Sequence, residues 1–166
     1  MVSLVVFNTS QGWMGIIGSS LGLKEIILPQ KSKQKLLSHF GDNHYHLLEN
    51  DFSAFSNLPQ RLRRYLGGEL INFTDTLDLA GTTAFQQSVW RITQNIPYGK
   101  TRSYSWISDQ LGYAGKAARA VGQALGKNPL PIVIPCHRVI SADGSLGGFT
   151  GGLELKNLLL NLESAQ

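Results

Sequence analysis

The pattern of apolar residues along the chain changes near residue 80. Before that point, short apolar runs such as LVVF, GIIG and EIIL are separated by Gly, Ser and Asn. Short apolar runs between turn-forming residues are typical of antiparallel strands. Beyond that point, apolar residues recur at the three- and four-residue spacing of amphipathic helices. We therefore predict two domains, an α/β domain over residues 1–80 and a mainly helical domain over residues 81–166.

The first domain is expected to contain two or three antiparallel strands between residues 4 and 29. A surface helix is predicted over residues 31–40. A second helix is predicted to end at Gly67-Gly68, because glycine commonly terminates helices. Residues 71–82 (INFTDTLDLAGT) show neither the short apolar runs of strands nor the apolar spacing of helices. We therefore expect an extended connector that contains the domain boundary.

Three helices are predicted early in the second domain. Thr83 is a suitable N-cap for a helix that Pro97 terminates. A short helix is expected to begin at Ser103 or Ser105, and the next helix is expected over residues 116–127 (KAARAVGQALGK). A short helix, a glycine-containing turn and a second helix have the outline of a helix-turn-helix.

Basic residues are concentrated in the second domain. The net charge of the chain is +4, and between residues 82 and 138 seven Lys and Arg residues accompany a single acidic residue, Asp109. One face of the 116–127 helix would carry long polar side chains, at Lys116, Arg119, Gln123 and Lys127. A solvated basic edge on a core helix is one explanation of this pattern. Together with the charge distribution, the pattern favours contact with nucleic acid.

Composition excludes several classes of protein. Apolar residues make up 42% of the chain, enough for a packed core and too many for global disorder. No apolar run is long enough to span a membrane, and the N-terminus lacks the basic flank of a secretory signal. The one cysteine excludes an internal disulfide, so we expect a cytoplasmic protein. The spacing of His39, His44 and His46 matches no strong metal template, and we interpret this segment as a solvated loop.

The only cysteine lies in the run IVIPCHRVI, residues 132–140. An isolated cysteine is most often a small buried apolar residue. Here, however, His137 and Arg138 follow directly, and a thiol becomes a nucleophile when a base or a positive charge favours its thiolate. Neighbours on a strand point to opposite faces, which would separate Cys136 from His137 if the run were extended. The glycine-bearing residues 141–148 form a loop able to fold over a ligand.

The heptad IPCHRVI resembles the active-site signature of the O6-alkylguanine-DNA alkyltransferases, also called methylated-DNA–protein-cysteine methyltransferases. Other segments follow the family's order and approximate spacing, namely Ser103-Tyr104, KAARAVG, Lys127-Asn128-Pro129, Gly147-Gly148-Phe149 and GGLELKNLLLNLE. The resemblance covers essentially residues 82–163 and is looser in the first half, chiefly through QGWMGIIGSSLGLKEIIL. The combined pattern is highly specific, whereas PCHR alone is only moderately so.

The resemblance implies a ribonuclease H-like α/β first domain with an antiparallel sheet. It implies a helical second domain that carries a helix-turn-helix and the active-site cysteine loop. In the family, the second helix of this motif enters the minor groove, and an arginine fills the gap left by a flipped nucleotide. Arg119 matches this arginine. The other positions expected at the DNA are Lys116, Ala117, Ala118, Ala120 and Gly122.

The resemblance also assigns chemical roles. Cys136 matches the nucleophile that accepts the alkyl group from guanine O6, and His137 matches the residue that takes the thiol proton through a water molecule. Glu163 matches the carboxylate that orients the imidazole, the logic of a catalytic triad. Tyr104 matches the hydroxyl that donates to the leaving purine, and Asn128 matches the residue that ties the helix-turn-helix to the cysteine loop.

A substrate pocket is implied around these residues. Phe149 would stack on the flipped base, and the Thr150 N–H would face O6. The carbonyl groups of Cys136 and Val139 would accept from the exocyclic amine, and Pro131 would line the alkyl side. The implied partner is double-stranded DNA containing O6-alkylguanine, while activity on O4-alkylthymine stays open. Because the alkyl–sulfur bond is stable to water, each chain is expected to act once and to need no cofactor. The resemblance also implies a monomer.

Two positions depart from the family pattern, and other functions stay open. Phe149 stands where some members have tyrosine, and Trp106 stands where a smaller or polar residue is expected. A non-catalytic binder of damaged DNA shares the fold, but in such proteins tryptophan typically replaces the cysteine. An unrelated cysteine hydrolase using Cys136 and His137 leaves the basic helix unexplained. A plain helix-turn-helix regulator leaves the PCHR loop unexplained.

Overall fold

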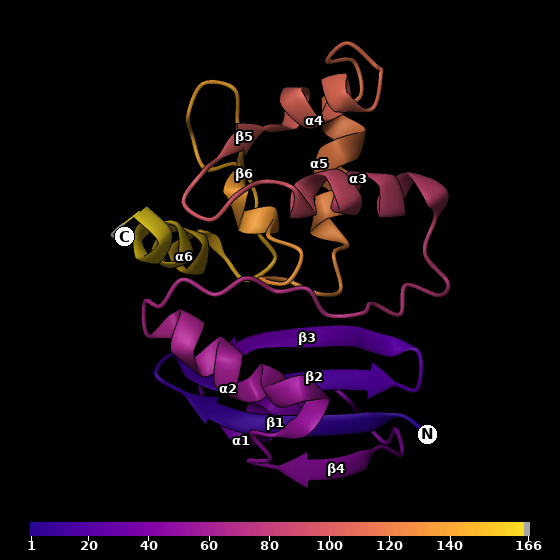
Figure 1. Cartoon of the computed structure of the whole chain (residues 1–166), viewed down its shortest axis with the longest axis vertical. Helices are drawn as coiled ribbons and strands as arrows, with labels where there is room; N and C mark the ends of the chain where they lie inside the picture. Colours follow the sequence, from indigo (N-terminus) through magenta and orange to yellow (C-terminus); the bar gives the residue numbers. More distant parts are fainter. Residues whose placement is uncertain (165–166) are drawn as a thin grey trace. The chain divides into compact units, whose positions relative to one another are not determined.

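The computed structural model describes residues 1–164, and the chain divides into two units, Met1–Asp78 and a second unit that begins at Leu79 (Figure 1). The first unit combines a sheet with two helices, and the second is mainly helical. Among residues 1–164, no helix has both the length and the hydrophobicity that a membrane span requires.

A four-stranded sheet in the order β3-β2-β1-β4 organises the first unit. The prediction of antiparallel strands is confirmed for β1 (Ser3–Thr9), β2 (Gly12–Ser19) and β3 (Gly22–Gln30). A fourth strand, β4 (His46–Glu49), pairs in parallel with β1 and was not predicted. Three of its four residues are exposed, and its two apolar residues, Leu47 and Leu48, are too few for the longer apolar run that marks a strand in sequence. The prediction of a loop is therefore wrong at His46.

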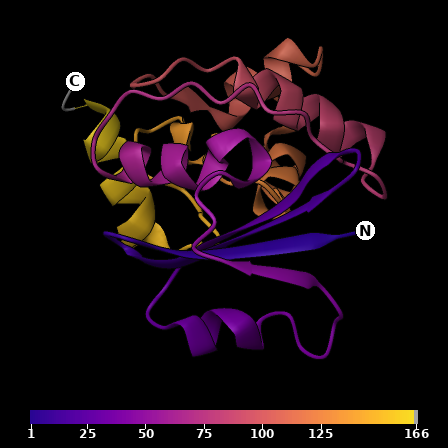
Figure 2. The ribbon, with the colours of Figure 1, turned by 60° about the horizontal axis from the view of Figure 1, so that its bottom comes forward.

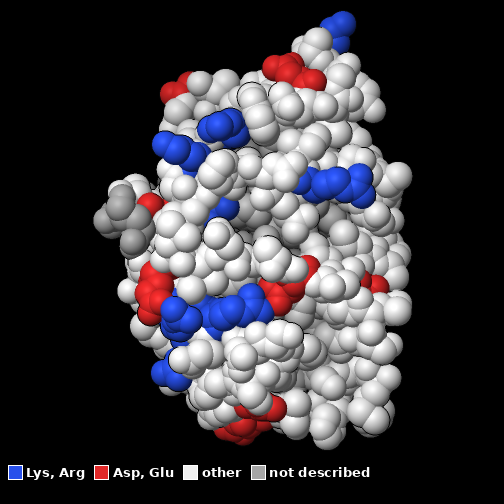
Figure 3. Space-filling model, viewed as in Figure 1, with Lys and Arg blue, Asp and Glu red and all other residues white. Residues whose placement is uncertain are grey.

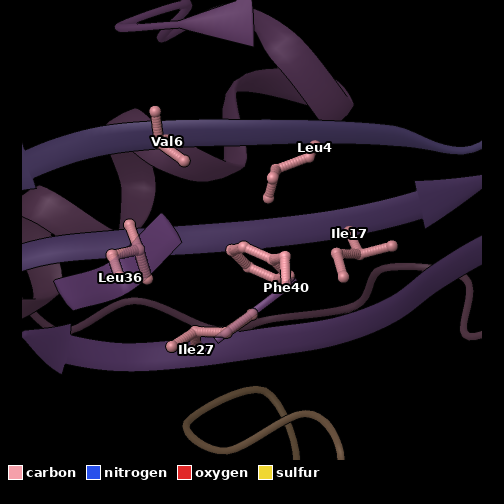
Figure 4. Close-up of a cluster of buried hydrophobic side chains, with 6 residues drawn as sticks. All are labelled: Leu4, Val6, Ile17, Ile27, Leu36 and Phe40. Atoms are coloured by element: carbon pink, nitrogen blue, oxygen red, sulfur yellow. The ribbon is translucent and has the colours of Figure 1, made fainter. Parts of the chain in front are cut away.

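The two faces of this sheet are covered by different helices, α1 (Lys33–Ser38) and α2 (Ala54–Leu66) (Figure 2). Successive residues of a strand point to opposite faces, so each central strand contributes apolar side chains to both layers. Figure 4 shows the core on the α1 side. Its buried members are Leu4, Val6, Ile17, Ile27, Leu36 and Phe40. Burial of both sheet faces supplies the apolar area that stabilises this small unit.

Helix α2 ends at Gly67, as predicted. Its first turn is irregular, since Phe55, Ser56 and Asn57 have positive φ values. Two of its arginines pair with carboxylates in the segment that follows the helix. Arg61 pairs with Asp75, and Arg64 Nη2 lies 2.7 Å from the Glu69 carboxylate. Figure 3 shows such basic and acidic atoms side by side over this helix.

Local capping signals define the first two helices of the second unit. Thr83 caps α3 (Ala84–Gln94) through a capping box with Gln86, which confirms the predicted start. Ser103 caps α4 (Tyr104–Gln110) by accepting a hydrogen bond from the Trp106 N–H, which settles the choice between Ser103 and Ser105.

Helix α5 spans Ala118–Gly126 and is shorter than the predicted 116–127. Lys116 lies in the preceding turn, and the Ala117 N–H donates to Ser108 Oγ at 2.9 Å instead of entering the helix. Lys127 is the C-cap, with φ −101°. The four-residue polar stripe is therefore wrong as a helical face, because only Arg119 and Gln123 belong to the helix.

A short parallel pair of strands brings two distant segments together. β5 (Arg102–Ser103) pairs with β6 (Val139–Ile140). β5 leads directly into Tyr104, and β6 directly follows the turn η1 (Cys136–Arg138). The pairing therefore holds Tyr104 close to the cysteine turn. The last helix, α6 (Leu153–Ser164), packs against that turn.

Candidate active site

Cys136 lies in a turn of 3₁₀ helix, not in a strand. Neighbouring residues of a 3₁₀ helix are separated by about 120°, so they need not point to opposite sides. Cys136 is 9% exposed, and His137 is completely buried. The strand geometry that would have separated these two residues is therefore absent at this position.

The Cys136 side chain borders a pocket of about 650 Å³. Residues of α4, α5 and the loop before α6 line it. These residues are Tyr104, Ala118, Arg119, Gly122, Gln123, Leu125, Gly126, Gly147, Gly148, Phe149 and Thr150. Cys136 therefore lines a cavity large enough for a nucleobase, beside the helix on which Ala118, Ala120 and Gly122 are expected to meet DNA.

Asn128 holds the cysteine turn in place from the end of α5. Its Oδ1 accepts from the Leu130 N–H at 2.9 Å, and its Nδ2 donates to the Ile134 carbonyl at 2.9 Å. The same Nδ2 lies 3.1 Å from Cys136 Sγ. Between these anchors, Ile132 has a φ of 76°, a strained value for a β-branched residue. Strain of this kind concentrates at functional sites.

Behind Cys136, three charged or titratable side chains form one buried network. His137 Nε2 lies 2.7 Å from Glu163 Oε1. Arg138 donates to both oxygens of that carboxylate, from Nε to Oε2 at 2.9 Å and from Nη2 to Oε1 at 2.9 Å. The Gly99 N–H adds a longer bond to Oε2, at 3.3 Å. Because an ionised carboxylate only accepts, Nε2 carries the imidazole hydrogen, and the basic lone pair of neutral His137 is on Nδ1.

The pKa shifts of this network favour a neutral base next to a neutral thiol. Burial raises the pKa of the Cys136 thiol, although the Asn128 hydrogen bond opposes the shift. Burial lowers the pKa of His137 more than Glu163 raises it. Burial alone would raise the pKa of Glu163, but the hydrogen bonds from His137 and Arg138 prevail and lower it to about 2. The thiol of Cys136 therefore keeps its proton, and His137 is neutral and able to accept one.

Tyr104 forms one wall of the pocket, and glycines allow its position. A Cβ atom at Gly147 would lie 2.5 Å from the Tyr104 hydroxyl oxygen, and φ at Gly147 is +71°. Any other residue there would therefore strain the backbone and displace the tyrosine ring. Burial raises the pKa of Tyr104, so its hydroxyl keeps the proton at neutral pH.

The residues expected at DNA occupy different places. Ala118, Arg119 and Gly122 line the pocket from α5, and Arg119 is exposed. Ala120 is exposed on the same helix, whereas Ala117 is the partly buried N-cap. The expected Lys116 lies in the turn before the helix, as described above. The structure thus brings the arginine and two small residues together in the lining of the pocket.

Only some of the residues predicted for the substrate pocket line the cavity. Phe149 and Thr150 line the cavity, and Thr150 Oγ1 donates to the Gly126 carbonyl at 3.2 Å. Among the described residues, the lining does not include Pro131 or Val139. Both are buried, and the Val139 carbonyl accepts a bond from Lys156. Only the carbonyl of Val139 was expected to meet the base, so its buried side chain does not decide that role.

Sequence reasoning missed the parts played by Arg138 and Lys156. Arg138 was considered only as a positive charge near the thiol, and Lys156 was assigned no role. A signal was available for Lys156. It lies three and seven residues before Leu159 and Glu163, on one face of α6, and all three side chains are buried. Once Glu163 is placed inward, Lys156 must follow.

Comparison with known proteins connects this geometry to characterised chains. The family model of the 6-O-methylguanine DNA methyltransferase DNA-binding domain matches residues 84–165. A methylated-DNA–protein-cysteine methyltransferase of Mycobacterium tuberculosis (strain H37Rv) is 53% identical over 116 residues, 70% of this chain and 69% of that protein. One from Methanosarcina acetivorans is 39% identical over 160 residues, 96% of this chain and 97% of that protein. The crystal structure of M. tuberculosis OGT in complex with DNA is similar with a TM-score of 0.80 and 39% identity, covering 98% of this chain and 93% of that one.

Proposed function

Because the chain belongs to the methylated-DNA–protein-cysteine methyltransferase family, we propose that it repairs DNA by moving an alkyl group from guanine O6 to Cys136, once and irreversibly. The observation that carries the assignment is the only cysteine of the chain, which borders a nucleobase-sized pocket and is backed by a buried His–Glu–Arg network. It is a methylated-DNA–[protein]-cysteine S-methyltransferase that uses itself as the acceptor.

The proposed reaction is a displacement at the alkyl carbon. The thiol proton of Cys136 passes to His137 Nδ1 through a water molecule, and Glu163 stabilises the imidazolium that forms. The sulfur then forms a bond to the alkyl carbon while the bond from carbon to O6 breaks, and the electron pair moves to guanine. Tyr104 donates to the purine as it leaves. The imidazolium of His137 then returns the thiol proton to the tyrosinate through water. The net result is a thioether on the protein and a neutral guanine, with His137 and Tyr104 back in their starting protonation states.

We infer single turnover from the product. A thioether is stable to water, and none of the proposed roles includes a group that would cleave it. The reaction needs no cofactor on this account. The monomeric state and the cytoplasmic location stay predictions.

A helix-turn-helix in residues 81–166 is proposed to bring DNA to the pocket. α4, the turn over residues 111–117 and α5 form the motif, and α5 would enter the minor groove. Ala118 and Gly122 support this, since both leave the backbone of α5 accessible at the pocket. For residues 1–80 we propose a ribonuclease H-like topology, supported by three antiparallel strands with a fourth parallel to the first.

Intact-mass measurement tests the function. After incubation with duplex DNA containing O6-methylguanine, the protein is expected to gain one methylene, about 14 Da, and peptide mapping should place it on Cys136. The gain should stop at one methyl group per chain even with excess DNA. A folded protein that binds the lesion without gaining mass would support the non-catalytic binder. More than one repaired guanine per chain would support a hydrolase.

Substitution of Arg119 tests base flipping. Arg119→Ala is expected to slow transfer from duplex DNA by about 10- to 100-fold, because extruding a base costs a few kcal/mol and the arginine would fill its place. Transfer from free O6-benzylguanine should change by less than about 3-fold, since no flipping is needed. Single-turnover rates on both substrates provide the comparison.

Lys127→Ala is the matched control for Arg119→Ala. Lys127 is an exposed basic residue at the C-cap of α5, and it does not line the pocket. Its removal is expected to weaken DNA binding in a salt-dependent manner without altering the ratio between the two substrates. If Arg119→Ala slowed transfer from duplex DNA and from free O6-benzylguanine equally, Arg119 would have no role in base flipping.

A further inference from the structure

Lys156 is a completely buried lysine beside the proposed site. Its ammonium group donates to three main-chain carbonyl groups, those of Val139 at 2.7 Å, Gly148 at 3.0 Å and Leu146. A buried ammonium group carries a large desolvation cost unless such partners satisfy its donors. The three carbonyls use all three donors of the group.

These carbonyl groups belong to two separate segments of the chain. Val139 directly follows the cysteine turn, while Leu146 and Gly148 flank Gly147 in the loop that walls the pocket. The same ammonium group lies 5.9 Å from the centroid of the Tyr104 ring. A single side chain from α6 therefore joins the base of the cysteine turn to the pocket wall.

The charge of Lys156 also acts on the site. Burial lowers the pKa of Lys156 to about 8, and Cys136 opposes that shift, so the group is mostly protonated at neutral pH. Its partners are neutral carbonyls, and no ion pair between Lys156 and a carboxylate is found within residues 1–164. The positive charge therefore remains available to favour a thiolate on Cys136.

We propose that Lys156 is a positioning residue for alkyl transfer, whose ammonium group fixes the Leu146–Gly148 wall against Val139 and so holds the guanine in line with the Cys136 sulfur. This rests on the proposed function, because the wall matters only if a base occupies the pocket. In-line displacement is sensitive to alignment, and a misplacement of about 1 Å costs about 100-fold in rate.

Lys156→Met tests the proposal, since methionine has a similar length and lacks the donors. At saturating lesion DNA, the single-turnover transfer rate is expected to fall about 100-fold. Alkylation of Cys136 by iodoacetamide at the same pH needs no aligned base and should fall less than about 10-fold, through the lost charge alone. Equal losses in both reactions, or transfer within about 3-fold of wild type, would overturn the positioning role.

Thr93→Val is the matched control for a purely structural effect. Thr93 is completely buried, and its hydroxyl bonds the Val89 carbonyl within α3, away from the pocket. This variant is expected to lower the melting temperature while leaving the ratio of the two rates unchanged. A comparable drop in the ratio for Thr93→Val would assign the effect of Lys156→Met to stability and overturn the proposal.

A measurement on the wild-type protein covers the case in which Lys156→Met does not fold. The backbone amides of residues 146–148 are expected to show NMR order parameters of about 0.85, the value of rigid backbone, although they lie in a loop. Values below about 0.6 would mean that the wall is not clamped. If wild type gains no methyl group, the proposed function fails, whereas this measurement still decides whether residues 146–148 are held rigid, as the proposal requires.

Discussion

Cys136→Ala is expected to accept no alkyl group at all while still folding and binding lesion-containing DNA. The chain has no second cysteine to replace the nucleophile. The substitution removes only one sulfur atom, at a side chain that is 9% exposed and borders a cavity. Asn128 Nδ2 keeps its bond to the Ile134 carbonyl, and only its bond to the sulfur is lost. We expect a loss of stability of only about 1 kcal/mol, the ordinary cost of a single substitution.

Two measurements on Cys136→Ala distinguish acceptance of the alkyl group from binding of lesion DNA. Intact mass after prolonged incubation with O6-methylguanine DNA should stay unchanged, and fluorescence anisotropy should show tighter binding to lesion DNA than to matched undamaged DNA. Cys136→Ser is the conservative control. Its hydroxyl is a far weaker acid than a thiol, so it should also gain no mass. A methyl group on the alanine variant would place the acceptor elsewhere in the chain and remove the basis of the proposed function.

Signals that act within a few residues were readable from sequence. Thr83 and Gly67 mark helix ends where predicted, because capping depends on hydrogen bonds to neighbouring residues. The start of α5 was not readable, because the Ala117 N–H bonds to Ser108, nine residues earlier. Strand β4 was missed because its residues are mostly exposed, and its pairing with β1 is a long-range contact.

The sequence predicted which residues form much of the site, but not where every side chain lies. Cys136, His137 and Glu163 follow from the family pattern, and the structure brings the imidazole and the carboxylate into contact. The burial of Arg138 follows from packing against α6, which no local pattern encodes. The burial of Lys156 was indicated only by its spacing from Leu159 and Glu163 on α6. Long basic side chains are usually exposed, so sequence reasoning assigns them to the surface by default.

Glu163→Gln is expected to slow transfer by about 10³-fold or more and to destabilise the second unit. Loss of the carboxylate behind a catalytic histidine typically costs about 10⁴-fold, because the imidazole adopts the wrong tautomer. Here both oxygens are fully used. Oε1 accepts from His137 and Arg138, and Oε2 accepts from Arg138 and the Gly99 N–H. An amide NH₂ at either position would oppose a donor, so neither orientation of glutamine fits.

The destabilisation caused by Glu163→Gln should become smaller as the pH falls. The folded-state pKa of Glu163 is lowered to about 2, below the ordinary value of 4.5. The carboxylate therefore contributes its full stabilisation above pH 4.5 and loses it as the pH falls towards 2. At pH 7, Glu163→Gln leaves Arg138 buried without its counter-charge, and breaking such a pair typically costs about 3–5 kcal/mol. Urea unfolding at pH 7 and pH 3 should show the difference from wild type shrinking at the lower pH.

Glu154→Gln provides the same chemical change on the same helix. Glu154 lies exposed in the first turn of α6, so its substitution should change stability by no more than about 0.5 kcal/mol and leave transfer unaffected. Transfer should be measured at a temperature where all three proteins are folded, so that the rate reports the site and not the unfolded fraction. Wild-type transfer by folded Glu163→Gln would show that His137 needs no carboxylate to take the thiol proton. The Glu163–Arg138 pair would then be structural alone, since its loss would alter the unfolding curves and not the chemistry.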